Sequence, residues 1–226
     1  MRFDAILFDF DGVLIESEYA GNRQIATYLS SIGHPTTPEQ SMANFMGLAG
    51  ADFLAAIERW IGRAVPEGFH VARAEEDRRA IEQGMDAVAG AVAFVRSLPP
   101  ELPIAIASSS TTNWIEAHLR HIGLFDRFEG RIFSGREHVA RVKPAPDIYL
   151  HAAAALGVDI GRTLVIEDSP VGATGAVASG ATVVGLCAGS HCQPAHADTL
   201  RARGVQAIAA SFADVQRMLT MSPAES

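Results

Sequence analysis

Six short apolar runs, separated along most of the chain by helix-like segments, constrain the fold of this sequence more than any other feature. Helical spacing of apolar residues connects the last five runs; in residues 114–122, for example, Ile115, Leu119 and Ile122 share one face. Strands that alternate with helices build βαβ units. We therefore predict an α/β protein with a Rossmann-like parallel sheet and helices on both faces. The predicted strands are Ala5–Phe8, Ile104–Ala107, Arg131–Phe133, Leu164–Ile166, Thr182–Leu186 and Gln206–Ala209.

A long stretch without a convincing strand separates the first two predicted strands. It carries helical patterns at Asn22–Ile32, Ala51–Ile61 and Ala72–Gln83. Since a βαβ crossover needs only about a dozen residues, this stretch is too long to be a simple connection. We predict an inserted all-helical subdomain at residues 17–90 and a Rossmann-like core at residues 1–16 and 91–226. Breakers of helical structure punctuate the insertion, namely Gly33, Pro35, Pro38, Gly47, Pro66 and Gly84.

Composition and charge narrow the class of protein. The chain has 226 residues, 48% of them hydrophobic, and a formal net charge of −8. Its length allows a substantial core, and its negative charge argues against a nucleic-acid partner, which usually requires a basic face. Cys187 and Cys192 are too few for a secreted disulfide framework, and no apolar stretch is long enough to span a membrane. We therefore expect a cytoplasmic monomer with neither a nucleic-acid nor a membrane partner.

Polar residues gather where the predicted strands end, which is where parallel sheets bind ligands. Asp9 and Asp11 follow the first strand, and a run of three serines from Ser108 follows the second. Lys143 precedes a helix, and Glu167-Asp168 follows the fourth predicted strand. Taken singly, strand-end acids are often solvated turn residues and serines before a helix are often N-caps. Their joint placement favours a functional site.

The residue types in these groups indicate the chemistry of such a site. Carboxylates repel one another and are costly to bury, and several of them without a neighbouring His or Cys favour a hard cation such as Mg²⁺. A serine-rich turn that opens a helix offers N–H groups and hydroxyls to an anion. Lys143 adds a fixed positive charge. A cation, a lysine and an anion cradle together indicate phosphoryl transfer.

The same residues resemble, in order and spacing, the four motifs of the haloacid dehalogenase-like (HAD) hydrolase superfamily. These are Asp9-Phe-Asp11-Gly12-Val13-Leu14, Ser108, Lys143-Pro144 and Glu167-Asp168. The similarity extends to residues 142–148 and 165–172 and so spans essentially the whole chain. It is strongest to the branch of small phosphatases and β-phosphoglucomutase-like proteins with a helical cap after the first motif. Residues 17–90 would be that cap.

This resemblance implies a role for each motif residue. Asp9 would be the nucleophile that forms an aspartyl-phosphate, and Asp11 the general acid and then the general base. The phosphoryl group would be bound by Ser108, Ser109 and Lys143. Mg²⁺ would be held by Asp9, by the backbone carbonyl of Asp11, by Asp168, and by Glu167 directly or through water.

The resemblance also favours one reaction within the superfamily. Dehalogenation needs no acid at the position of Asp11, because no alkoxide has to be protonated. β-Phosphoglucomutases carry a histidine and an arginine in the cap, where this chain has Gly21 and Gly50. We therefore predict a Mg²⁺-dependent phosphatase for a small metabolite, a sugar or sugar-acid phosphate. The alternatives are a sugar phosphomutase of the β-phosphoglucomutase type and, in another class, a catalytically idle protein that retains the fold and senses a ligand or binds a partner.

Of three further features, two have two interpretations each and one has a single interpretation. The turn Phe45-Met46-Gly47 and the pair Arg78 and Arg79 are candidate substrate contacts of the cap, or a packed loop and a solvated helix face. Glu16 stands where relatives often have Asp, and we assign it to the hinge of the cap. A group of potential zinc ligands matches no familiar paired motif, and relatives carry a similar Gly-Ser-His loop, so a structural loop is favoured. This group comprises Cys187, His191, Cys192 and His196.

Overall fold

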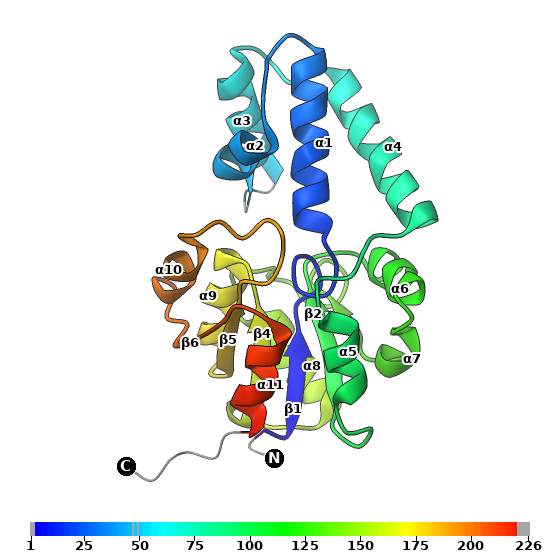
Figure 1. Cartoon of the computed structure of the whole chain (residues 1–226), viewed down its shortest axis with the longest axis vertical. Coiled ribbons are helices and arrows are strands. Elements are labelled where there is room, and N and C mark those ends of the chain that lie inside the picture. The colour runs from blue at the N-terminus through cyan, green and yellow to red at the C-terminus, as the bar shows by residue number, and fades with distance from the viewer. Residues whose placement is uncertain (1–2, 47, 49, 221–226) are drawn as a thin grey trace. The chain divides into compact units, whose positions relative to one another are not determined.

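The computed structural model of the chain describes residues 3–46, 48 and 50–220. It divides the chain into two compact units, one of Met1–Glu16 with Asp86–Ser226 and one of Ser17–Met85. The larger unit contains six strands that pair in parallel in the order β3-β2-β1-β4-β5-β6 (Figure 1). The prediction of a Rossmann-like α/β fold is therefore confirmed. The strands are β1 (Ala5–Phe8), β2 (Ile104–Ser108), β3 (Ile132–Ser134), β4 (Thr163–Glu167), β5 (Thr182–Leu186) and β6 (Ala207–Ala209).

The strand order places β1 at the centre of the sheet, between β2 and β4. From β1 the chain proceeds to β2 and β3 on one side and returns to β4, β5 and β6 on the other. In a parallel sheet this reversal opens a crevice beyond the carboxyl ends of the central strands. The residues that follow β1 and β4 therefore meet at the point where such folds bind ligands.

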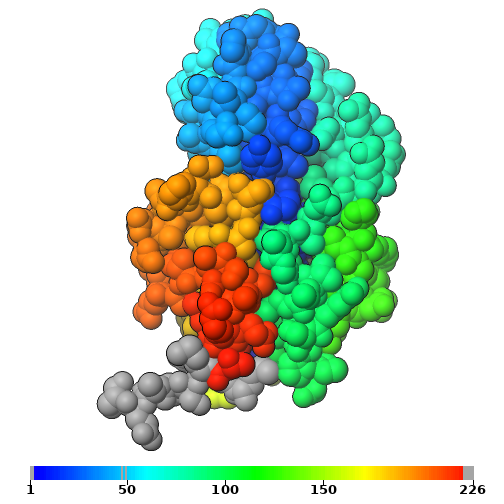
Figure 2. Space-filling model, in the orientation of Figure 1, coloured from blue at the N-terminus to red at the C-terminus, as the bar shows by residue number. Residues whose placement is uncertain are grey.

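The strands β1 to β4 are buried along their whole length, and alternate side chains enter different layers. Leu7 belongs to a cluster with residues of α8 (Asp147–Leu156) and α9 (Pro170–Ala178). Its neighbour Phe8 instead packs edge-on against Phe94 and Phe128. Helices therefore cover both faces of the sheet; α5 and α11 lie side by side in front in Figures 1 and 2. The remaining helices of this unit are α5 (Ala91–Ser97), α6 (Thr112–His121), α7 (Phe125–Phe128), α10 (His196–Arg201) and α11 (Phe212–Thr220), with a short 3₁₀ turn at Ile160–Arg162.

Among the described residues of the smaller unit, the regular secondary structure is entirely helical. Its core is aromatic, since Phe69 packs against Tyr28 and Phe53, with ring centroids 5.4 and 6.1 Å apart. Buried Ile57 and Leu29 complete this core. The helices are α1 (Ser17–Ser31), α2 (Pro38–Phe45), α3 (Gly50–Ile61) and α4 (Glu67–Gln83).

The sequence prediction lacks helix α2, because it treats Pro38 as a breaker. Proline is tolerated in the first turn of a helix, where its missing N–H has no partner to lose. Here it opens α2, and Thr37 and Gln40 form a reciprocal capping box around it. The breaker interpretation of Pro38 is therefore wrong.

Residues 86–90, which we placed in the insertion, lie with the larger unit. The amide of Glu16 donates to the carbonyl of Asp86 at 3.0 Å, and the amide of Val88 donates to Leu14 at 3.0 Å. Val88 is also buried. Backbone pairing with the segment after β1 thus attaches these residues to the larger unit.

Among the described residues, no helix is both long and apolar enough for a membrane span.

Candidate active site

The sheet brings together residues that are distant in sequence. Asp9 follows β1, and its amide donates to the carbonyl of Ile166 on β4 at 2.9 Å. Glu167 is the last residue of β4, and Ser108 is the last residue of β2. Because β2, β1 and β4 are adjacent and parallel, their carboxyl ends lie at one edge of the sheet. The predicted site residues of these strands therefore lie at this edge.

Lys143 connects two of the carboxylates. Its Nζ donates to Asp9 Oδ1 and to Glu167 Oε1, both at 2.6 Å. The three side chains are 5%, 9% and 0% exposed. Burial alone would lower the pKa of Lys143, but the charges of Asp9 and Glu167 outweigh it and raise the pKa well above its usual value. Lys143 is therefore a permanent buried cation beside Asp9.

Glu167 is held on both of its oxygens. Oε1 also accepts a hydrogen bond from the Tyr149 hydroxyl at 2.8 Å. Oε2 accepts from the amide and hydroxyl of Ser169, at 2.9 and 3.0 Å. Ser169 is also the N-cap of α9, so Glu167 joins Lys143 to the start of this helix. The sequence analysis did not predict that Tyr149 belongs to this site, because in the sequence it looks like any other residue on the apolar face of a helix.

Asp9, Glu167 and Asp168 form a group that could hold a cation. One oxygen of each lies within 4.8 Å of the others, and all three residues are buried. Burial, and after it the charge of Glu167, raises the pKa of Asp168 well above its usual value. Burial also raises the pKa of Asp9 well above its usual value, although the charge of Lys143 acts in the opposite direction. Asp168 Oδ1 is buried and has no hydrogen-bond partner among the described residues. Buried oxygen ligands of this kind fit a hard divalent cation.

The side chain of Asp11 lies apart from this group. Its Oδ2 accepts from the Ser110 hydroxyl at 2.5 Å, and its Oδ1 accepts from Trp114 Nε1 at 3.1 Å. Within the described residues the carboxylate group that could hold a cation does not include Asp11. Sequence reasoning assigned Trp114 only to a helix. Its place in the first turn of α6, the helix that follows the serine run, was the available signal.

The predicted phosphate-binding serines occupy the turn between β2 and α6. Ser108 is buried, and its hydroxyl accepts from the amide of Ser110 at 3.0 Å. Ser109 is exposed. The turn leads into α6, whose N-cap is Thr111. Main-chain N–H groups and hydroxyls therefore lie close to the end of β1, as an anion site requires.

A family model for haloacid dehalogenase-like hydrolases matches residues 3–180 of this chain. The chain belongs to the haloacid dehalogenase-like hydrolase family. The 6-phosphogluconate phosphatase of Escherichia coli strain K12 is 28% identical over 195 residues, which cover 85% of this chain and 86% of that protein. Hexitol phosphatase A of the same strain is 28% identical over 189 residues, covering 82% and 84%.

Solved structures agree with this membership. A haloacid dehalogenase-like protein of unknown function from Agrobacterium tumefaciens strain C58 has a TM-score of 0.88 at 31% identity, covering 96% of this chain and 97% of that one. A HAD family hydrolase from Deinococcus radiodurans R1, solved with bound phosphate and sodium, has a TM-score of 0.84 at 32% identity, covering 96% and 95%. The prediction of an enzyme, a phosphoric monoester hydrolase of this family, is confirmed.

The structure also shows where the candidate cap contacts and Glu16 lie. Arg78 and Arg79 are exposed on α4 and pair with Glu75, at 2.8 and 3.1 Å, as on a solvated helix face. Phe45 is buried in the aromatic core of the smaller unit, whereas Gly47 lies outside the described residues. Glu16 accepts a hydrogen bond from the amide of Ser190 at 2.9 Å.

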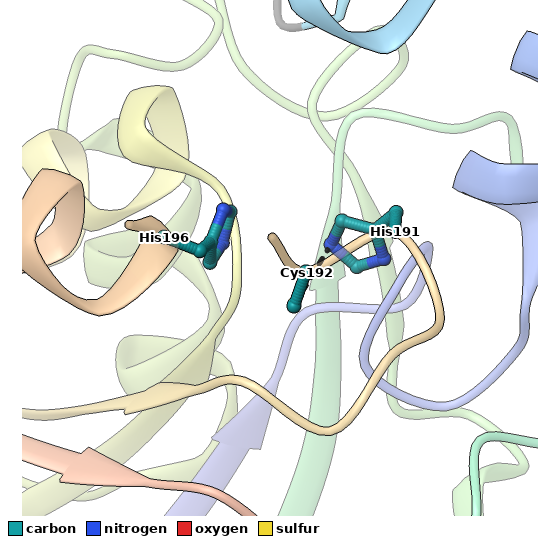
Figure 3. Close-up of side chains that lie close together, drawn as sticks. All are labelled: His191, Cys192 and His196. Atoms are coloured by element: carbon teal, nitrogen blue, oxygen red, sulfur yellow. Dashed lines mark hydrogen bonds between the residues drawn. The ribbon is translucent and has the colours of Figure 1, made fainter. Parts of the chain in front are cut away.

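Three of the four potential zinc ligands lie together. Ligand atoms of His191, Cys192 and His196 fall within 4.8 Å of one another (Figure 3). Cys187 is not in this group among the described residues, but a hydrogen bond with Cys192 lowers the pKa of its thiol to about 7. His191 and His196 each contact Asp168 as well, so this loop adjoins the carboxylate group.

Proposed function

We propose that this chain is a Mg²⁺-dependent phosphatase that hydrolyses a small sugar or sugar-acid phosphate through an aspartyl-phosphate on Asp9. The observation that carries the proposal is a buried lysine bonded to the predicted nucleophile, beside two further buried carboxylates. The relatives named above as phosphatases of 6-phosphogluconate and of hexitols support the substrate class.

Charge compensation is the first task of this site. A phosphate dianion near 4 Å from a carboxylate is repelled by about 4 kcal/mol for each charge pair at an effective dielectric near 20. Lys143 offsets part of this repulsion, because its Nζ lies 2.6 Å from Asp9. Asp9 and Asp168, with the backbone carbonyl of Asp11, would hold Mg²⁺. When bound, Mg²⁺ would supply the remaining positive charge and polarise the phosphoryl oxygens. Because its two oxygens already accept four hydrogen bonds, we assign Glu167 to holding Lys143 and, through water, the cation.

The first half-reaction transfers the phosphoryl group to Asp9. A carboxylate oxygen of Asp9 attacks phosphorus while the bond from phosphorus to the ester oxygen breaks. Asp11 gives its proton to the leaving alkoxide, and the alcohol departs. Ser108, Ser109 and Lys143 bind the phosphoryl oxygens during this transfer.

The second half-reaction restores the enzyme. Asp11, now ionised, removes a proton from water, and the water oxygen attacks phosphorus. The bond between phosphorus and Asp9 breaks, and inorganic phosphate leaves. Trp114 and Ser110 hold the two oxygens of Asp11 and so fix this group near the reacting atoms. We assign substrate selection to the helical insertion, which would act as the cap of the site.

The test is a screen for released phosphate over a panel of sugar, sugar-acid and sugar-alcohol phosphates, with Mg²⁺ and with EDTA. We expect Mg²⁺-dependent release from at least one of them and loss of all turnover in Asp9→Asn, with an unchanged far-UV circular dichroism spectrum. Turnover that survives in Asp9→Asn would contradict the nucleophile assignment. Isomerisation of a hexose 1-phosphate in the presence of a bisphosphate primer, at a rate above that of phosphate release, would favour the mutase instead.

A further inference from the structure

We propose that His191 is a positioning residue that orients the carboxylate of Asp168. The loop after β5, residues 187–195, would hold His191 in position. This inference rests on the proposed function, since it takes Asp168 as a cation ligand. The proposed mechanism uses neither His191 nor this loop, although His191 is buried against the site.

Two histidines contact Asp168. His191 Nε2 lies 2.8 Å from Asp168 Oδ2, and the two side chains are 1% and 2% exposed. His196, at the start of α10, places its Nε2 2.6 Å from the backbone carbonyl of Asp168. The two rings are nearly perpendicular, with centroids 5.5 Å apart, and approach from the loop and from the helix (Figure 3). Asp168 is thus held on its side chain and on its backbone.

The contact with His191 determines which oxygen of Asp168 can bind a cation. A neutral imidazole with its proton on Nε2 is sufficient to donate to Oδ2. Oδ1 is then the buried oxygen without a hydrogen-bond partner among the described residues. Without the donor the carboxylate could rotate, and Oδ2 would compete with Oδ1 for the cation. Residues that hold ligands in this way tune metal affinity in many metal sites.

The space around His191 is shaped for this contact. A Cβ at Gly189 would lie 2.6 Å from two atoms of the His191 ring. A Cβ at Gly12, which has a φ of +77°, would lie 2.1 Å from Asp168 Oδ2 and 2.9 Å from His191 Cε1. Two glycines from separate segments therefore leave the room in which His191 meets Asp168.

A second contact fastens the loop to the segment after β1. Both the amide and the hydroxyl of Ser190 donate to Glu16 Oε2. Glu16, which the sequence assigns to the hinge, therefore bonds to the residue before His191. The loop is therefore fixed by the hydrogen bonds of Ser190 to Glu16, and the next residue, His191, contacts Asp168.

A zinc site is the competing interpretation of the same residues. Cys192 Sγ lies 3.4 Å from His191 Nε2, and the group with His196 has suitable ligand atoms. However, the Nε2 atoms of both histidines already lie within hydrogen-bond distance of Asp168. We therefore favour the positioning role, and zinc is one outcome of the test.

The test measures Mn²⁺ binding to the full chain by electron paramagnetic resonance, beside the Mg²⁺ dependence of hydrolysis of an aryl phosphate. We expect His191→Leu to weaken Mn²⁺ binding by about 10- to 100-fold, with little change in KM for the ester at saturating Mg²⁺. His191→Gln should retain most of the affinity, since its amide nitrogen can take the position of Nε2. His191→Asn, which is shorter, should behave like His191→Leu and keeps the test informative if His191→Leu does not fold.

The matched control is His118→Leu, because His118 is equally buried in the same unit but does not contact Asp168. It should leave Mn²⁺ affinity unchanged, whatever its effect on thermal stability. Wild-type Mn²⁺ affinity in His191→Leu or His191→Asn would overturn the inference, as would equal affinities for the Gln and Asn variants. One equivalent of zinc in the purified protein, lost in Cys192→Ser, would assign His191 to zinc instead.

Failure of the inference is distinguishable from failure of the proposed function. A wild-type protein that neither binds Mn²⁺ nor requires Mg²⁺ would refute the cation site itself, whatever the variants do. A wild-type protein that binds Mn²⁺ and hydrolyses esters, with unaffected His191 variants, would refute only the role of His191.

Discussion

At the strand ends of the larger unit three charged side chains are buried and bonded to one another, whereas the charged pairs on helix α4 of the smaller unit are exposed. The Nζ atom of Lys143 lies 2.6 Å from a carboxylate oxygen of Asp9 and 2.6 Å from one of Glu167, and each of these side chains is less than a tenth exposed. On α4, Arg78 and Glu75 contact at 2.8 Å with exposed fractions of 55% and 40%. Both apolar cores, in contrast, combine aliphatic and aromatic side chains.

This difference between buried and exposed ion pairs bears on which of them serve the reaction and which contribute to stability. A buried ion pair contributes little net stability, because desolvation of both charges offsets their attraction. Its presence in the larger unit is therefore explained better by a requirement of the reaction than by folding. Exposed pairs on a helix contribute little in either respect. The smaller unit depends for its stability on its aromatic core.

The substitution with the largest expected effect on this comparison of buried and exposed ion pairs is Lys143→Met. We expect kcat/KM for an aryl phosphate to fall by about 10²- to 10³-fold, because a preorganised positive charge next to the proposed nucleophile is lost. The free energy of unfolding should fall by about 3–5 kcal/mol, since Asp9 and Glu167 remain buried without their cation. Steady-state kinetics and urea unfolding measure both effects. Arg141→Met is the control, because Arg141 is 72% exposed and pairs with Asp147. Activity within tenfold of wild type for Lys143→Met would contradict the comparison.

The corresponding change in the smaller unit is Phe69→Ala. Phe69 is 2% exposed and contacts two aromatic rings, so truncation should lower the free energy of unfolding by about 3–5 kcal/mol. Urea unfolding followed by circular dichroism measures this loss, and Phe69→Leu should show a smaller one. The folded fraction should keep its kcat for a small aryl phosphate. A loss of kcat as large as that of Lys143→Met would place catalytic groups in the smaller unit after all.

A subtler change within the larger unit is Trp114→Phe, which removes the indole N–H from Asp11 and keeps most of the ring. A hydrogen bond to a charged group contributes about 1.5–3 kcal/mol, so kcat should fall by about tenfold or more. Because the contact is to the proposed proton donor, KM should change much less than kcat. The pH dependence of kcat provides the second readout. A change in KM alone would assign Trp114 to substrate binding.

The smallest effect is expected for Arg78→Ala. The guanidinium of Arg78 hydrogen-bonds to Glu75 and Glu82 on the same exposed helix face, and these hydrogen bonds raise its pKa. Its removal should leave the melting temperature within experimental error and kcat/KM unchanged for every accepted substrate. A substrate-specific rise in KM would show that this helix face reads the substrate.

Much of the architecture could be predicted because it depends on local patterns. Runs such as Ala5–Phe8 are apolar on both faces, and this pattern is typical of a strand covered by helices on both sides. Parallel strands end at one edge, so residues that follow different runs, such as Asp9 and Ser108, could be grouped from their positions along the chain alone. Pro38 misled the prediction, because a proline at the start of a helix and one that breaks a helix look alike without the cap residues.

The contacts that complete the site could not be predicted in this way. Trp114 reaches Asp11, Tyr149 reaches Glu167 and His191 reaches Asp168. Each joins a helix or a loop to a residue at or just after the end of a strand, and none repeats with a period that a sequence pattern would reveal.

The sequence by itself determined the class of fold, the insertion after the first strand and the motif residues of a haloacid dehalogenase-like hydrolase, because these follow from periodicity, breakers and chemically distinctive motifs. Only the tertiary structure decided which side chains hold those residues. That decision depends on the close packing of loops and helices around the strand ends, where two glycines let His191 reach Asp168 and a buried lysine lies between two carboxylates.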